Sequence, residues 1–301
     1  MRTAISPPYT KDMPVGAKTS RSPWFYAWRR FQKNKLAVLA GVVLIVIILA
    51  AIFAPWITPT HYTEQIYLDR VNDFPSRENW FGVDTLGRDY FTRVIYGARV
   101  SLGVGFAAAL GSLVIAVPLG TIAGYKGGKA DWLVMRLVEI MSVIPPLLIA
   151  ILLATMTGGG LANIVLIGAA FLWVNVCRLV RGQVMSLREK EFILASRALG
   201  SRPAYIIKRH LIPNTVAEIL VGLVLTIPQA IILEASLSFL GVGISPPTPS
   251  WGQMISEGLY YIFFYWHLPL FPALMLGLTI LCLSVVGDGI RDALDPTLKG
   301  R

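Results

Sequence analysis

The sequence predicts an all-α membrane protein that crosses the bilayer six times. Its 301 residues are 55% hydrophobic and only 15% charged, and the mean hydropathy is +0.63. Because a charge buried in hydrocarbon is costly, so low a charged fraction is typical of polytopic membrane proteins and unusual in soluble domains. The net charge of +10 does not indicate nucleic-acid binding, since the excess cations lie in loops beside apolar runs.

Six apolar runs are each near the ~20 residues that a helix needs to span a bilayer. The first follows a basic stretch that extends to Lys35, and it is longer than the core of a cleavable signal peptide. We therefore expect it to be retained as a span. The runs lie at 36–56, 101–123, 132–156, 161–180, 215–240 and 268–286.

The distribution of Lys and Arg predicts that both termini are cytoplasmic. Residues 1–35 contain eight Lys/Arg and one acid, and residues 181–213 contain seven Lys/Arg and two acids. Residues 57–100 carry five basic and six acidic residues, and residues 241–267 carry no Lys or Arg. All the strongly basic segments therefore fall on one side of the membrane. The predicted parts are a cytoplasmic arm (1–35), a first span (36–56), an extracytoplasmic loop (57–100), a core of five spans (101–286) and a cytoplasmic tail (287–301).

Prolines interrupt four of the predicted spans. Pro118 lies in the second, Pro145 and Pro146 in the third, Pro228 in the fifth and Pro272 in the sixth. Proline removes a backbone hydrogen bond, and membranes tolerate this where neighbouring helices or water satisfy the freed carbonyl. Kinked helices suit a pathway that opens and closes, although packing explains any single proline equally well. We take Pro145, Pro146 and Pro228 as candidate pathway or gating residues.

Charged residues within the predicted spans are few. Arg136 and Glu139 are three residues apart on one helical face, where they can pair. Glu234 lies near the outer end of the fifth span, and it either faces the substrate or caps and pairs with the outer loop. We include Glu234 among the candidate pathway residues.

The second predicted span is rich in small residues. Glycines and alanines at such spacings allow helix backbones to approach closely, so we expect this helix deep in the bundle or at a subunit interface. The residues are Gly103, Gly105, Ala107, Ala108, Ala109 and Gly111.

The sequence contains no recognisable catalytic motif. It has no Gly-rich phosphate loop ending in Lys-Ser/Thr, no His-Glu-x-x-His and no Gly-x-Ser-x-Gly. The histidines are scattered, and neither cysteine has metal-ligand spacing. We therefore expect no metal or cofactor on this chain and no enzymatic activity. Any energy that the protein uses must therefore come from a partner, and the basic segment 181–213 is the available docking surface.

That segment resembles the Glu-Ala-Ala loop of ABC importer permeases. The resemblance rests on LASRALG at 194–200, followed after nine residues by HLIP at 210–213. The spacing from Gly200 to Pro213 fits the family pattern, whereas Leu194 stands where the family prefers Glu and Ser196 replaces the second Ala. Glu191, one helical turn upstream, is the candidate substitute for the missing carboxylate.

Further motifs resemble the dipeptide/oligopeptide/nickel permease family over most of the chain. They are FGVDTLGRD at 81–89, YGARVSL at 96–102, SFLGVG at 238–243, PSWG at 249–252 and GDGIRDALDP at 287–296. A first span followed by an outer loop resembles the C-type subunit, the second of the two permeases in such systems. The resemblance implies a type I importer permease fold with a cytoplasmic coupling loop.

The resemblance also implies partners and a location. Two different permeases share one pathway in a bacterial or archaeal inner membrane, two ATPase subunits use ATP and Mg²⁺ below it, and an external binding protein delivers the substrate. A short helix from Arg188 to Leu199 would lie in a groove of one ATPase, with apolar residues filling the groove, cations meeting acidic groups, and Gly200 allowing the turn. The implied ATPase-coupling residues are Arg188, Lys190, Glu191, Phe192, Ile193, Ala195, Ser196, Arg197, Leu199, Gly200 and Pro213.

Two other classes of function remain as alternatives. A stand-alone channel or ion-coupled carrier requires buried ionisable residues along a path, which the sequence lacks. A membrane anchor without a pathway would not require several kinked spans or a long docking loop. Within the importer family, peptides are the expected substrates, and nickel, glutathione and oligosaccharides are the alternatives.

Overall fold

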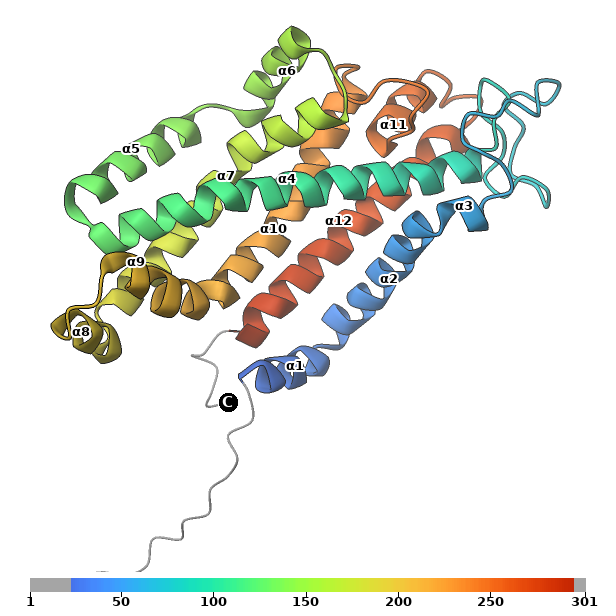
Figure 1. Ribbon diagram of the computed structural model, residues 1–301. Coiled ribbons are helices and arrows are strands. Elements are labelled where there is room, and N and C mark those ends of the chain that lie inside the picture. Colours follow the sequence, from blue (N-terminus) through green and yellow to red (C-terminus); the bar gives the residue numbers. More distant parts are fainter. Residues whose placement is uncertain (1–22, 295–301) are drawn as a thin grey trace, which may run out of the picture.

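The computed structural model describes residues 23–294, and the regular structure in that range is almost entirely helical (Figure 1). The exception is an isolated β-bridge between Val83 and Asp89. Predictions for residues 1–22 of the basic arm and 295–301 of the tail lie outside the described residues. The helices are α1 (Pro23–Lys33), α2 (Lys35–Ile52), α3 (Ala54–Ile57), α4 (Tyr90–Lys126), α5 (Gly128–Val143), α6 (Pro146–Thr157), α7 (Leu161–Arg188), α8 (Glu191–Ala198), α9 (Pro203–Ile206), the π-turn η1 (Ile207–Leu211), α10 (Ile212–Phe239), α11 (Trp251–Leu259) and α12 (His267–Leu294).

Length and composition allow five or six spans, against the six expected. Among the described residues, five helices are long and apolar enough to cross a membrane, and α5 with α6 forms a sixth if that bent pair is counted as one. The helix that contains the second apolar run is longer than that run, because α4 begins at Tyr90 rather than at residue 101. Asp89 caps this helix by accepting a hydrogen bond from the backbone N–H of Thr92 at 2.8 Å.

The predicted third span is broken rather than kinked. Helices α5 and α6 meet at an angle of 83°, and Ile144 and Pro145 between them are extended. Pro145 disfavours a helical conformation at Ile144, and Pro146 supplies the first residue of a new helix, where its missing N–H costs nothing. Pro118, in contrast, lies inside the continuous helix α4.

Helix α4 runs through the whole bundle beside α7 and α10 (Figure 1). A Cβ at Gly120 would lie 2.7 Å from the carbonyl oxygen of Cys177, and one at Gly124 would lie 2.8 Å from that of Arg181, both in α7. Gly111 of α4 comes equally close to Ala169, at 2.8 Å from its Cβ. The expectation that this span lies deep in the bundle is confirmed, because only glycines allow this approach of α4 to α7.

One end of the bundle, which we call the loop end, carries residues 57–89 and α11. There Asp84 forms an ion pair with Arg88 at 2.6 Å, and Arg93 of α4 lies 3.5 Å from the same carboxylate and 3.8 Å from Glu257 of α11. We call these four residues the loop network. The indole N–H of Trp251 also donates to the carbonyl of Val94 at 3.0 Å. These bonds tie α11 to the first turns of α4.

Candidate functional site: a coupling segment between α7 and α10

Residues 181–213, the coupling segment, lie at the opposite end of the bundle from the loop end. The end of α7, then α8, α9 and η1 project there, with α8 the most distant from the loops (Figure 1). Helix α8 has eight residues, so a single short helix follows the long spanning helix α7. The segment therefore presents a discrete helical element beyond the packed spans.

Gly200 turns the chain after α8. Its φ is +79°, in the left-handed region that glycine adopts at low cost. The N–H of Gly200 donates to the carbonyl of Arg197 at 2.9 Å, and that of Ser201 donates to the carbonyl of Ser196 at 3.1 Å. These two bonds form a Schellman motif, the usual glycine-dependent end of a helix. The turn predicted at Gly200 is present.

Pro213 shapes the return into the spanning helix α10. Because Pro213 has no N–H, the backbone before it widens into a π-turn, in which the N–H of Ile212 donates to the carbonyl of Ile207. Pro203 begins α9 at the position where proline is most compatible with a helix. The two prolines thus delimit a second short helical element that is continuous with α10.

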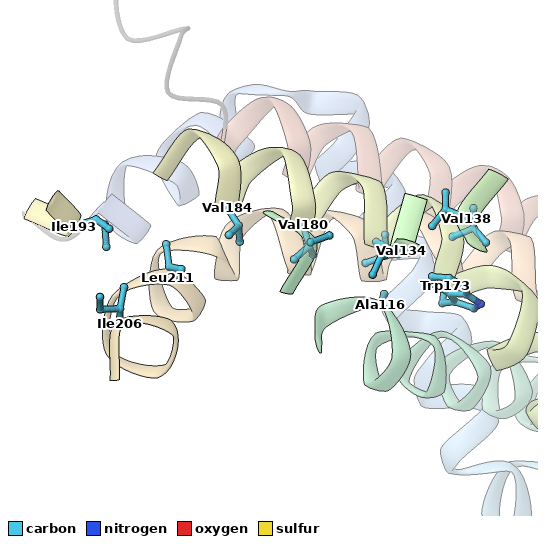
Figure 2. Close-up of a cluster of buried hydrophobic side chains, with 13 residues drawn as sticks. Ala116, Val134, Val138, Trp173, Val180, Val184, Ile193, Ile206 and Leu211 are labelled. Carbon is cyan, nitrogen blue, oxygen red and sulfur yellow. The ribbon is translucent and has the colours of Figure 1, made fainter. Parts of the chain in front are cut away.

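One side of the coupling segment packs into the hydrophobic core of the chain. Ile193, Ile206 and Leu211 are each 0% exposed, and they share a buried cluster with Val180 and Val184 of α7 (Figure 2). This corrects the expectation for Ile193, which points toward its own α7 and is not available to a partner's groove. The cluster joins α8 to α7, α9 and the π-turn η1.

The other side presents apolar side chains to the surroundings. Leu199 is 86% exposed, Phe192 is 45% exposed and Leu194 is 48% exposed. Tyr205, on α9, is 53% exposed. Leu194 and Tyr205 were not among the predicted contacts, although both lie within a helical turn or two of residues that were. Burial of Ile193 and exposure of its neighbours could not be read from sequence, since the segment is too short to show a clear period.

The seven cations of the segment differ in their partners, and the first, Arg181, forms an ion pair with Asp131 of α5. The other six divide into two groups. Arg188 donates to Glu189 at 2.8 Å and to the carbonyl of Gly124 at 3.2 Å, and the guanidinium of Arg197 lies 4.8 Å from the ring centre of Tyr125. These two are bound to the end of α4. In contrast, four exposed cations form no ion pair with any described residue. They are Lys190, Arg202, Lys208 and Arg209.

Sequence comparison assigns most of the chain to one family. Residues 116–300 match the binding-protein-dependent transport system inner membrane component. The chain belongs to this permease family. In addition, residues 22–75 match the N-terminal TM domain of oligopeptide transport permease C.

Several curated proteins resemble this permease over almost its whole length. The oligopeptide transport system permease protein of Bacillus subtilis is 43% identical over 284 residues, covering 94% of this chain and 92% of that protein. The dipeptide transport system permease protein of the same organism is 44% identical over 274 residues, covering 91% and 85%. The glutathione transport system permease protein of Escherichia coli O157:H7 is 42% identical over 280 residues, covering 93% and 92%.

The fold of the permease resembles that of a solved importer. An inward-facing structure of the MetNI methionine ABC transporter aligns with a TM-score of 0.53 and 20% sequence identity, covering 68% of this chain and 97% of that chain. This likeness shows the fold alone. It agrees with the type I permease fold expected from the motifs.

The candidate pathway residues of the permease lie in different settings. Pro145 and Pro146 form the break between α5 and α6, whereas Pro228 is buried within the continuous helix α10. Glu234 is 0% exposed, and it accepts hydrogen bonds from Ser101 at 2.9 Å and Ser238 at 2.8 Å. In this conformation Glu234 therefore faces protein rather than a pathway, and its two serine partners were not predicted.

The ion pair predicted from spacing within the third apolar run is confirmed. The guanidinium of Arg136 lies 3.2 Å from the carboxylate of Glu139, and the two side chains are 62% and 61% exposed. Arg178 of α7 donates to Ser142 of α5 at 2.5 Å. These contacts lie in the second half of α5, close to the break at Pro145.

Proposed function

We propose that this chain is one of two different permease subunits of an ATP-driven importer, and that the pair forms the pathway for peptides delivered by an external binding protein. The observation that carries this proposal is the coupling segment, which is anchored on one side and unpartnered on the other. A family of membrane components that depend on separate binding proteins and ATPases requires such a surface. The membership of the chain in that family supports it.

The geometry supports a rigid-body transmission of force. Ile193 locks α8 onto α7 and the π-turn, while Arg197 holds α8 against Tyr125 at the end of α4. A push on the exposed face of α8, at Phe192 and Leu199, would therefore reach three spanning helices without first bending α8. Packed interfaces respond to such a push by switching between discrete arrangements, as in other domain rotations.

The exposed apolar residues and the free cations predict the chemistry of the partner surface. Leu199 and Phe192 would enter an apolar groove of an ATPase subunit, and Lys190 and Arg202 would face acidic groups at its rim. ATP and Mg²⁺ belong to that partner. Among residues 23–294 no group of three His, Cys, Asp or Glu could hold a metal ion.

Peptides are the proposed substrate class. Two of the similar proteins are permeases of oligopeptide and dipeptide transport systems, and a third belongs to a glutathione transport system. Glutathione is itself a small peptide, so the substrates named for all three systems have peptide bonds and carboxylates that a binding site could recognise. Both termini and the coupling segment are proposed to be cytoplasmic, because the basic segments of the sequence lie on that side.

Replacement of Phe192 and Leu199 by Asp tests the docking surface. Both side chains are exposed, so the double variant should insert and fold normally but lose co-purification with the ATPase subunits and lose peptide uptake in reconstituted vesicles. A matched control replaces Tyr260 and Phe263 by Asp, because these residues are also exposed, at 85% and 95%, but lie at the loop end. The control should keep the ATPases bound.

Stable recovery of the ATPases with the Phe192/Leu199 variant would overturn the assignment of this face. Uptake by the purified chain without any ATPase would instead favour a channel or ion-coupled carrier. If the unaltered chain binds the ATPases but takes up no peptide, the proposed substrate class is wrong while the docking role stands.

A further inference from the structure

Helix α1 precedes the first spanning helix and has two chemically different sides. Its sequence, PWFYAWRRFQK, places Ala27, Trp28 and Phe31 within one arc at helical spacing, while Arg29 and Lys33 fall on the opposite arc. Only Asn34 separates α1 from α2, and its side chain caps α2 by accepting from the N–H of Ala37 at 3.1 Å. An amphipathic helix therefore adjoins the point where the chain enters the bilayer.

Part of the apolar side of α1 packs against the end of α12. Ala27 is buried, and a Cβ at Gly289 of α12 would lie 3.2 Å from the ring of Phe31 and 2.6 Å from the Cβ of Ala37. Figure 1 shows α1 beside the ends of α2 and α12. This packing holds α1 at the same level as the ends of two spanning helices.

The rest of α1 is uncovered, and it combines aromatic rings with cations. Trp28 is 59% exposed and Tyr26 is 50% exposed, and the Trp28 ring stacks on Phe31 with centroids 6.0 Å apart. Exposed cations accompany them at Arg29, Lys33 and, at the start of α2, Lys35.

No carboxylate in the described structure neutralises these three cations. They form no ion pair within residues 23–294, and the exposed acids on the neighbouring α12, Asp288 and Asp292, are not paired with them. The sequence itself contains no Asp or Glu between Asp12 and Glu64. A ligand that neutralises these cations must therefore be anionic, and it must lie at the level where α2 enters the bilayer.

We propose that α1 binds anionic phospholipid headgroups, with Tyr26 and Trp28 at the boundary of the acyl chains and Arg29, Lys33 and Lys35 on the phosphates. Amphipathic helices with this composition lie in the membrane interface, and Trp and Tyr are enriched at that depth. Each Lys or Arg near an anionic surface contributes about fivefold to binding. This assignment rests on the cytoplasmic orientation given under the proposed function, since the anionic surface potential acts on that leaflet.

Hydrogen exchange in lipid nanodiscs tests the assignment. The complex that contains this chain is reconstituted either in phosphatidylcholine alone or with added phosphatidylglycerol, and amide exchange in α1 is compared with that in α2. We expect exchange of α1 to be about tenfold slower or more with phosphatidylglycerol, and α2 to be unchanged. The variant Arg29→Gln/Lys33→Gln/Lys35→Gln should lose this difference, because its helix keeps the apolar side but not the charges.

The matched control is Arg202→Gln/Lys208→Gln/Arg209→Gln, which removes the same charge from the coupling segment and should leave the lipid response of α1 unchanged. Equal protection of α1 in the two lipids would overturn the proposal, because it would mean that protein rather than anionic lipid covers the helix. Persistence of the difference in the α1 variant would overturn it as well.

The orientation is measured separately. A Lys33→Cys chain is labelled with a membrane-impermeant thiol reagent in sealed vesicles of each sidedness, because Cys177 and Cys282 are both buried. Labelling from the external side would refute the proposed orientation while leaving the lipid response interpretable. Neither readout depends on uptake, so a failure of the transport proposal remains distinguishable.

Discussion

At the loop end, buried charged side chains pair with one another within the chain. In the coupling segment, the exposed cations have no acidic partner among the described residues. Asp84 and Arg88 are 6% and 7% exposed and lie 2.6 Å apart, while Lys208 and Arg209 are exposed and form no ion pair among the described residues. Charges that pair within the subunit maintain its own fold, whereas exposed charges without such a partner are available for association. The comparison separates residues that are paired within the fold from residues that we propose to contact a partner.

The same contrast appears in the apolar residues. Trp251 is fully buried at the loop end and bonded to the backbone of α4, whereas Leu199 of the coupling segment is 86% exposed. Within the coupling segment the two kinds lie next to one another, because Ile193 is buried and Phe192 is exposed. Buried and exposed apolar residues are thus divided by helix face as well as by region.

The largest expected effect is on stability, from Asp84→Asn. Asp84 pairs with Arg88 and lies close to Arg93, so the amide would leave the buried Arg88 without a carboxylate and Arg93 with only Glu257, at 3.8 Å. The expected cost is about 3–5 kcal/mol. Thermal unfolding of the purified complex should show the loss. The control Asp73→Asn affects a half-exposed pair with Arg70 and should shift the melting temperature only slightly. Equal shifts for the two variants would contradict the division between the regions.

A smaller free-energy change with a large effect on coupling is expected from Gly200→Val. At a φ of +79° an L-residue costs about 1–2 kcal/mol and a β-branched one more, although a Cβ there meets no other atom within 4 Å. ATP hydrolysis stimulated by the loaded binding protein should fall by about tenfold. Asn tolerates this conformation, so Gly200→Asn should keep most of the activity. Full activity of the Val variant would show that the turn does not set the position of α8.

The smallest effect on stability is expected from Lys208→Gln with Arg209→Gln. Both side chains are exposed and form no ion pair with any described residue, so the free energy of unfolding should change by no more than about 0.5 kcal/mol. Affinity for the ATPase subunits should nevertheless fall, and its dependence on ionic strength should weaken, because fewer charges take part. Binding titrations at low and high salt measure this. An unchanged salt dependence would place the docking charges elsewhere.

Much of the fold follows from local sequence. The number of spans and the turn at Gly200 were predicted, because apolar length and glycine conformation are properties of short segments. The break at Pro145 and Pro146 was expected as a kink only, since the angle between two half-helices depends on what packs against them. The start of α4 was missed because Arg93 and Arg99 interrupt the apolar run before residue 101, although Asp89 caps the helix ahead of them.

The partition of the coupling segment was less predictable. Sequence identified the segment and its apolar and basic composition, but it placed Ile193 with Phe192 and Leu199 on the docking face. Eight residues of helix give too few turns for a reliable hydrophobic period. Likewise, Glu234 was recognised as unusual, whereas Ser101, its hydrogen-bond partner, lies 133 residues away in sequence.

By itself the sequence determined that this chain spans a membrane, that residues 181–213 form a basic interruption with a glycine turn, and that energy must come from a partner. These conclusions depend on composition and on spacings within short segments, and both can be read directly from the sequence. Only the tertiary structure decided which side of α8 is free, because that depends on residues of other elements, among them Val184, Ile206 and Leu211, that share a buried cluster with Ile193. Burial is a property of contacts between segments, and it cannot be read from any one of them.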